Sequence, residues 1–158
     1  ISISLSLFYA MRGMFLNSSM SMFFPNIELM VPILVIVTVW VNDTMAYLVG
    51  SFIGRTPISP ISPKKTWEGT IAGVILSVVI LSIVAGQYIP ISAKYLYLIT
   101  FVASVMGNLG DLFESKLKRL AGVKDSGSMM PGHGGFLDRF DSVLIAGPFV
   151  WLLLQFIF

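Results

Sequence analysis

Two carboxylates stand three residues apart, after a loop rich in glycine and before an apolar stretch. Asp138 and Asp141 share one face if this segment is helical, with Arg139 turned away, because residues three apart are neighbours on a helix surface. Mg²⁺ is commonly bound by one or two carboxylates together with phosphate oxygens of a substrate. The pair therefore predicts a magnesium site beside a bound phosphate, although an isolated pair at this spacing is typical of a solvated helix turn.

The loop before this pair has the composition of an anion-binding segment. Several backbone N–H groups can converge on one anion there, because glycine permits the required backbone conformations. The glycines are Gly127, Gly132, Gly134 and Gly135, and the nearby basic residues are Lys118, Arg119 and Lys124. His133 is the only histidine in the chain. We interpret it either as a structural residue of the loop or as a group that hydrogen-bonds phosphate or protonates leaving pyrophosphate.

Another polar group lies inside an apolar segment. Asn42 and Asp43 are flanked by VTVWV and MAYLVG, and a carboxylate at membrane depth costs about 2.5–3.5 kcal/mol, so it usually has a partner. Ala46, Gly50 and Gly54 follow at a spacing of four, which favours close approach of another helix. The polar pair is either a clamp between helices or part of a ligand cavity.

A basic loop leads into the next apolar segment. Three prolines make the region around Ser59–Gly69 stiff and extended, and Lys64 and Lys65 follow. Thr66 is placed to cap the next helix, with Glu68 in its first turn. The loop can grip a triphosphate or touch anionic lipid, and the sequence leaves both open.

A polar stripe follows on the next apolar segment. Ser104, Asn108, Asp111, Ser115 and Lys118 recur at spacings of four, three, four and three, so they line one face of a helix. For Lys118 at the basic end of this stripe, a water-facing helix end is a reasonable alternative. Asn108 and Asp111, which lie nearer the bilayer, point more strongly to a functional cavity.

The elements that position these groups must be membrane helices. Of the 158 residues, 56% are hydrophobic and 11% charged, with a mean hydropathy of +0.87, whereas soluble domains carry about 25% charged residues. The apolar runs are too continuous for barrel strands. We therefore predict an all-α, polytopic integral membrane helix bundle. Its spans are expected at about Ile27–Ile53, Thr70–Ile89, Tyr95–Leu112 and Ser142–Phe158.

The domain division follows from these spans. Residues 27–158 are expected to form a catalytic transmembrane domain, and residues 1–26 a truncated or interfacial helix and loop. The chain starts without Met or a basic n-region, so we expect further spans before it. The absence of cysteine excludes disulfides and thiolate metal sites. A net charge of +2 is too small to indicate nucleic acid, and none is expected as a partner.

Charge is concentrated in two segments. Five of the charged residues fall between Asp43 and Gly69, and ten between Asp111 and Asp141, out of eighteen. Two spans separate these segments, so both emerge on one face, and their Lys and Arg content predicts that this face is cytoplasmic. A cytoplasm-facing polar cavity, in a bacterial inner membrane or its equivalent, is therefore expected.

The run from Ser115 to Asp141 resembles the signature of the phosphatidate cytidylyltransferase (CDP-diacylglycerol synthase) family. Only Met130 departs from it, where the pattern usually has Leu, Ile or Phe. The positions in register are Ser115, Lys118, Arg119, Lys124, Asp125, Gly127, Pro131, His133, Gly134, Gly135, Asp138, Arg139 and Asp141. The stretches NDTMAY and SPKKTWEG also resemble shared parts of that family. The resemblance implies that CTP and phosphatidic acid give CDP-diacylglycerol and pyrophosphate, with Mg²⁺ and a possible second cation at the carboxylates.

These observations together define the expected site. The expected catalytic residues are Asp111, Lys124, Asp125, His133, Asp138 and Asp141, of which Asp111, Asp138 and Asp141 are the expected metal ligands. The expected substrate-binding residues are Asn42, Asp43, Lys64, Lys65, Thr66, Glu68, Ser115, Lys118, Arg119, Gly134, Gly135 and Arg139. The expected partners are CTP, phosphatidic acid and the bilayer. A homodimer is possible, because the small-residue faces suit contacts within or between chains.

Two other functions fit part of the pattern. A cytidylyltransferase for another membrane lipid phosphate would use the same motifs, because acyl tails meet only generic apolar surface. An ion-coupled transporter would explain Asp43 and Asp111 but not the glycine-rich loop.

Overall fold

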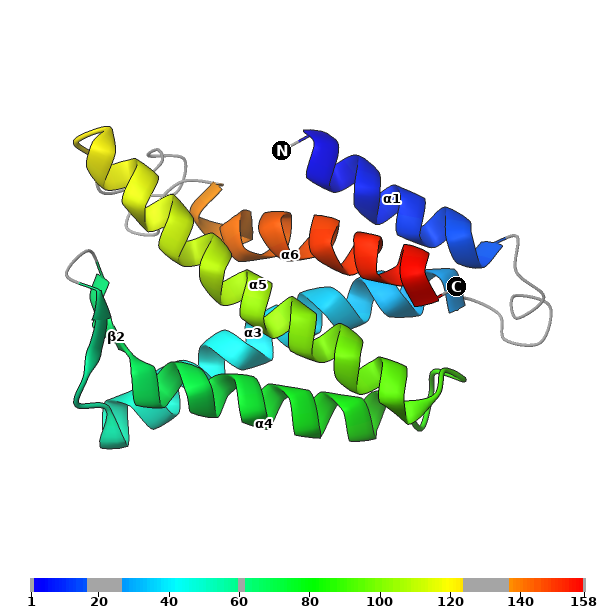
Figure 1. Ribbon diagram of the computed structural model, residues 1–158, viewed down its shortest axis with the longest axis horizontal. Coiled ribbons are helices and arrows are strands. Elements are labelled where there is room, and N and C mark those ends of the chain that lie inside the picture. The colour runs from blue at the N-terminus through cyan, green and yellow to red at the C-terminus, as the bar shows by residue number, and fades with distance from the viewer. Residues whose placement is uncertain (1, 17–26, 60–61, 124–136, 158) are drawn as a thin grey trace.

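The computed structural model describes residues 2–16, 27–59, 62–123 and 137–157, and it is a bundle of long helices with one short hairpin (Figure 1). The elements are α1 (Ser2–Leu16), α3 (Ile27–Ile53), β1 (Pro57–Ser59), β2 (Ser62–Thr66), α4 (Trp67–Ala85), α5 (Ala93–Leu120) and α6 (Leu137–Ile157). Within the described ranges, four helices are long and apolar enough to cross a membrane. The prediction of an all-α polytopic membrane protein is confirmed, with the small hairpin as an addition.

The four spans lie where the sequence predicts them, but their ends differ. The first matches the predicted range, since α3 covers Ile27–Ile53. Helix α4 begins three residues before the predicted Thr70, because the side chain of Thr66 caps it by accepting a hydrogen bond from the N–H of Gly69 at 3.2 Å. Helix α5 continues past the predicted Leu112 to Leu120, so the polar stripe stays helical beyond the apolar segment.

Helices α3 and α4 approach each other very closely. A Cβ atom placed on Gly69 would lie 2.5 Å from the carbonyl oxygen of Ala46, and one on Gly73 would lie 2.8 Å from that of Asn42. The small residues at positions 46, 50, 69 and 73 therefore face each other, which confirms the predicted close contact. Glycine also permits the α5–α6 contact, since a Cβ on Gly110 would lie 3.1 Å from the carbonyl oxygen of Asp141.

The basic loop between α3 and α4 forms an antiparallel hairpin. Pro57 pairs with Thr66 and Ser59 with Ser62, and the N–H of Trp67 donates to the carbonyl oxygen of Thr56 at 3.0 Å. The extended conformation was predicted; the strand pairing was not. The hairpin, the last turns of α5 and the start of α6 all lie at one end of the bundle, on the left in Figure 1. Both charged segments thus emerge at the same end, as the sequence predicts.

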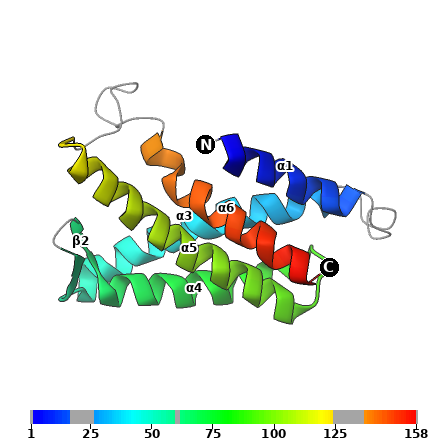
Figure 2. The ribbon, with the colours of Figure 1, turned by 45° about the horizontal axis from the view of Figure 1, so that its top comes forward.

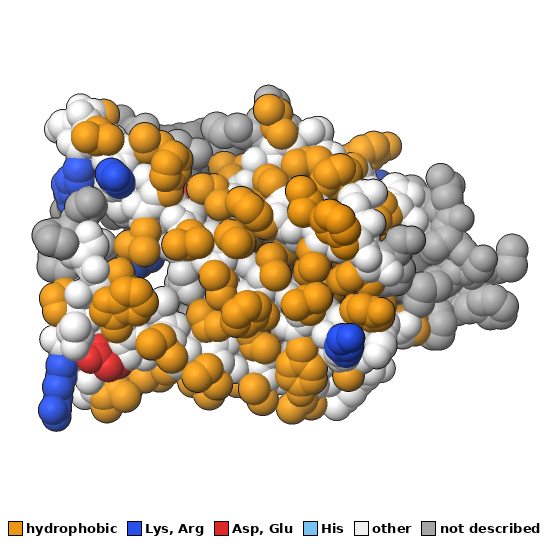
Figure 3. All heavy atoms as spheres, in the orientation of Figure 1, with side chains coloured by type: hydrophobic (Ala, Val, Ile, Leu, Met, Phe, Trp, Pro, Cys, Tyr) orange, Lys and Arg blue, Asp and Glu red, His pale blue; other side chains and the backbone are white. Residues whose placement is uncertain are grey.

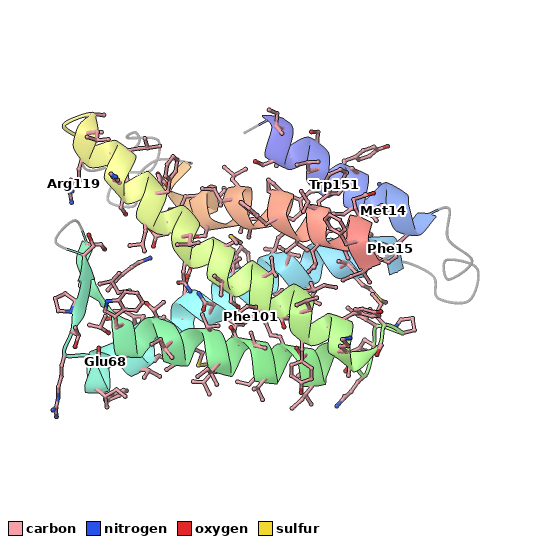
Figure 4. All side chains as sticks on the ribbon, viewed as in Figure 1. Met14, Phe15, Glu68, Phe101, Arg119 and Trp151 are labelled. Carbon is pink, nitrogen blue, oxygen red and sulfur yellow. The ribbon has the colours of Figure 1, made fainter. Side chains whose placement is uncertain are left out.

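Helix α1 belongs to the bundle rather than standing apart from it. It packs against α6 and α3 (Figure 2). The side chains of Met11 and Phe15 are almost fully buried. Met14 and Phe15 lie next to Trp151 of α6 in the packed interior between the two helices (Figure 4). This half of the bundle is apolar, so the polar groups are left to the other side.

Candidate functional site

A polar cavity of about 620 Å³ opens between α3, β2, α4 and α5. Its polar lining includes Asp43, Ser62, Lys65, Thr70, Asn108 and Asp111. The small residues Ala46 and Gly50, which belong to the close α3–α4 contact, also line it, together with Tyr47. Three elements that are close in the sequence and the more distant α5 thus build one cavity at the hairpin end of the bundle.

Two asparagines join α3 to α5 at the inner side of this cavity. The side-chain amide of Asn42 donates to Oδ1 of Asn108 at 3.1 Å, and that of Asn108 donates back to Oδ1 of Asn42 at 3.4 Å. Their exposed fractions are 0% and 9%. Asn42 also donates to Oδ1 of Asp43 at 3.3 Å. Asn42 therefore clamps the two helices, and Asp43 lines the cavity, where its contact with a ligand stays a prediction.

An ion pair between Lys65 and Asp111 crosses the cavity from the hairpin to α5. Their side chains are only 29% and 25% exposed. Burial lowers the pKa of the Lys65 ammonium below its ordinary value, and the carboxylates of Asp43 and Asp141 oppose that shift. Asp111 of α5 thus pairs with the ammonium group directly, whereas Asp43 of α3 and Asp141 of α6 act on it only through their charge.

Two residues of the capping motif tie the hairpin to the bundle. The carboxylate of Glu68 accepts hydrogen bonds from the backbone N–H groups of Arg55, at 3.3 Å, and Thr56, at 3.2 Å. Glu68 lies at the start of α4, at the base of the hairpin (Figure 4). Thr66 caps α4 and lines the cavity, whereas this geometry gives Glu68 a structural part. Contact of Glu68 with substrate stays a prediction.

The last turns of α5 carry a second charged pair. Nζ of Lys118 lies 3.3 Å from Oε1 of Glu114, and Glu114 is only 6% exposed. The sequence analysis missed Glu114, although its spacing of three from Asp111 and four from Lys118 places it on the same side of the helix. Ser115 is partly buried, and Arg119 is exposed at the end of α5 (Figure 4).

The remaining predicted residues lie partly outside the described residues. This applies to Lys124, Asp125, His133, Gly134 and Gly135, and for Lys64, Asp138 and Arg139 only the backbone is described. Oδ1 of Asp141 accepts hydrogen bonds from the N–H of Ser142 at 2.6 Å and from its hydroxyl at 3.3 Å. Within the described ranges, no three His, Cys, Asp or Glu side chains are grouped closely enough to hold a metal ion.

The sequence profile of the Cytidylyltransferase family matches residues 1–157 of this chain. A phosphatidate cytidylyltransferase of Bacillus subtilis is 50% identical over 121 residues, which are 75% of this chain and 45% of that protein. The chloroplastic phosphatidate cytidylyltransferase 4 of Arabidopsis thaliana is 45% identical over 119 residues, 72% of this chain and 29% of that protein. One from Synechocystis is 44% identical over 128 residues, 78% and 42% of the two chains. The chain therefore spans less than half the length of these relatives.

Proposed function

The chain belongs to the Cytidylyltransferase family, and we propose that it forms the membrane-embedded part of an enzyme that transfers the cytidylyl group of CTP to phosphatidic acid. The observation that carries this proposal is a cavity inside a bundle of apolar helices that is lined by Asp43, Lys65 and Asp111, with Lys65 and Asp111 paired across it. Because its carboxylates outnumber its lysine, the cavity would take a polyanion only together with cations, while the surrounding surface stays in lipid. The names of the relatives supply the two substrates.

The reaction requires little from the protein beyond charge neutralisation and positioning. The second pKa of a phosphate monoester is about 6, so the phosphate of phosphatidic acid is largely ionised at neutral pH. One of its oxygens attacks the α-phosphorus of CTP, the bond between the α- and β-phosphates breaks, and pyrophosphate leaves with the electron pair. The reaction needs no general base and no covalent enzyme intermediate. Lys65, Lys118 and Arg119 offset the combined negative charge.

We assign the predicted Mg²⁺ to Asp111 and Asp141, with Asp138 as the third ligand from the sequence motif. The donor types fit, because carboxylates are hard oxygen ligands, and Asp111 would have to release or share its pairing with Lys65 to bind the ion. When bound, Mg²⁺ neutralises phosphate charge in the transition state. A second cation at these carboxylates stays a prediction.

The expected location and assembly form part of this proposal. Basic residues at the hairpin end favour the cytoplasmic side of the membrane for the cavity, where CTP is available. For the homodimer, the small-residue faces of α3 and α4 are already used against each other within the chain. A dimer would need another surface, and it stays a prediction.

The test is transfer of label to lipid. The purified protein is incubated with phosphatidic acid and with CTP labelled in its α-phosphate. We expect the label in a lipid product and release of unlabelled pyrophosphate, and failure of any lipid to take up label would refute the proposal. A panel of other lipid phosphates separates phosphatidic acid from its chemical relatives. Ion uptake by proteoliposomes without lipid labelling would favour a transporter.

A matched pair of lysine variants links the activity to the cavity. Lys65→Ala removes the cavity's cation, whereas Lys94→Ala removes an exposed lysine at the opposite end of α5. We expect a loss of transfer of at least about tenfold in the first variant, since charge-assisted contacts contribute about 1.5–3 kcal/mol. We expect no change in the second variant. Equal activity of the two variants would contradict the role of Lys65.

A further inference from the structure

A second hollow, with almost entirely apolar walls, runs along the outer face between α4 and α5. Its volume is about 380 Å³. Trp67, Ile71 and Val74 form part of its α4 wall, and Phe101 and Leu109 form part of its α5 wall. Figure 3 shows hydrophobic side chains over most of this face, while charged side chains gather mainly at the hairpin end. Phe101 extends from α5 on the side of α4 (Figure 4). We call this hollow the α4–α5 groove.

The α4–α5 groove adjoins the polar cavity. Thr70 of α4 and Asn108 of α5 line both of them. They are the two polar residues of the groove, and they stand where its walls change from apolar to polar. A molecule with an anionic head in the cavity and an alkyl chain can therefore lie across this boundary with each part in matching surroundings.

We propose that the α4–α5 groove holds an acyl chain of the lipid phosphate whose head group reacts in the polar cavity. This inference rests on the proposed function, and it adds the path by which the lipid enters, sideways from the bilayer between α4 and α5.

A second apolar groove provides a comparison. It lies between α3 and α4 toward the end away from the hairpin, has a volume of about 330 Å³, and is lined by residues such as Leu34, Val37, Leu81 and Val84. It shares no residue with the polar cavity. Both grooves face lipid, so an apolar surface alone does not select the substrate's chain. The α4–α5 groove differs from the comparison groove because it adjoins the charged cavity.

The length of the groove limits how much of the chain it holds. Its α4 wall runs from Trp67 to Ile75, which is about 12 Å at 1.5 Å per residue. An acyl chain spans one leaflet, about half of the hydrocarbon core of about 30 Å, so the groove holds the part of the chain nearest the glycerol and leaves its end in lipid. The chain comes from lipid rather than water, so its burial gives little hydrophobic gain. The benefit is orientation of the phosphate, and a misplacement of about 1 Å can cost about 10²-fold in rate.

The experiment fills each groove with the same substitution. Val74 and Val84 both lie on α4, the first in the α4–α5 groove and the second in the comparison groove. Val74→Trp and Val84→Trp are assayed in mixed micelles with dioleoyl and with dibutyryl phosphatidic acid. A four-carbon chain ends before position 74, which lies about 6 Å along the helix from Thr70.

We expect Val74→Trp to lower kcat/KM for the dioleoyl lipid by about 10–100-fold, with little change for the dibutyryl lipid or in the KM for CTP. Val84→Trp should leave all three unchanged. Val105→Trp, on the opposite wall, should reproduce the dependence on chain length if Val74→Trp does not fold.

Three outcomes would overturn the assignment. Equal effects of Val74→Trp and Val84→Trp would mean that both grooves hold only bulk lipid. An equal loss on the long and short lipids would mean that the tryptophan damages the cavity rather than blocking a chain. Failure of the unaltered protein to label any lipid would instead refute the proposed function, and the assignment with it.

Discussion

Gly69→Ala places one methyl group in the close contact between α3 and α4. The new Cβ would lie 2.5 Å from the carbonyl oxygen of Ala46 and 2.8 Å from Cα of Gly50. Ordinary contacts begin at 3.4 Å, so α3 and α4 must separate by nearly 1 Å at this level. Both obstacles are backbone atoms, which cannot rotate away as a side chain can.

The expected losses of stability and activity follow from overpacking at the α3–α4 contact and from displacement of residues that line the cavity. Forcing an extra methyl group into a packed contact costs about 1–3 kcal/mol. The same separation moves Gly50 on α3 away from Thr66 and Thr70 on the other side, and all three line the cavity. A displacement of about 1 Å in a positioning group can cost about 10²-fold in rate. We expect Gly69→Ala to lose most transfer activity together with part of its thermal stability.

The assay compares this variant with Gly13→Ala, for which a Cβ would have no atom within 4 Å. Gly13 lies inside α1, where alanine is favoured over glycine by about 1 kcal/mol. Thermal unfolding in detergent and transfer of label from CTP to lipid are measured for both. Full activity and an unchanged melting temperature in Gly69→Ala would refute the argument that the α3–α4 contact shapes the cavity.

Three further predictions concern the polar groups. Asn108→Leu should lower the unfolding free energy by about 1–3 kcal/mol, because the amide of Asn42 is left buried with its main partner gone, and thermal melting checks this. Because the pKa of Lys65 is lowered, turnover should decline on the alkaline side at a lower pH than for an ordinary lysine, and less so in Lys65→Arg. At pH values between that lowered pKa and the ordinary pKa of lysine, Lys65 binds more protons in the unfolded chain than in the folded one. Its contribution to the free energy of unfolding should therefore rise with pH. Asp138→Ala, Asp141→Ala and Mg²⁺ chelation should each abolish CTP turnover without unfolding, and metal-independent turnover would contradict the assignment.

Much of the fold could be predicted from local pattern. Apolar runs of span length must form helices in lipid, because their backbone groups have no water to bond. The spacing of Ala46 and Gly50 predicted a close contact with another helix, and Thr66 was placed as a cap from its type and position. The pairing of Pro57 with Thr66 was not predicted, because the prolines indicated only an extended chain. Glu114 was missed since a single carboxylate on a long helix shows no sign of burial in the sequence.

The sequence by itself determined which segments lie in lipid, which end of the bundle carries the charge and which residue types could meet phosphates and a cation. Only the tertiary structure decided which of these residues meet. Asn42 pairs with Asn108, 66 positions away, and Lys65 of the hairpin reaches Asp111 of α5. Such pairs depend on the rotation and depth of each helix, which packing at contacts such as Gly69 against Ala46 sets. Polar spacing along one helix defines a face, but the neighbour of that face is chosen by the packing of the whole bundle.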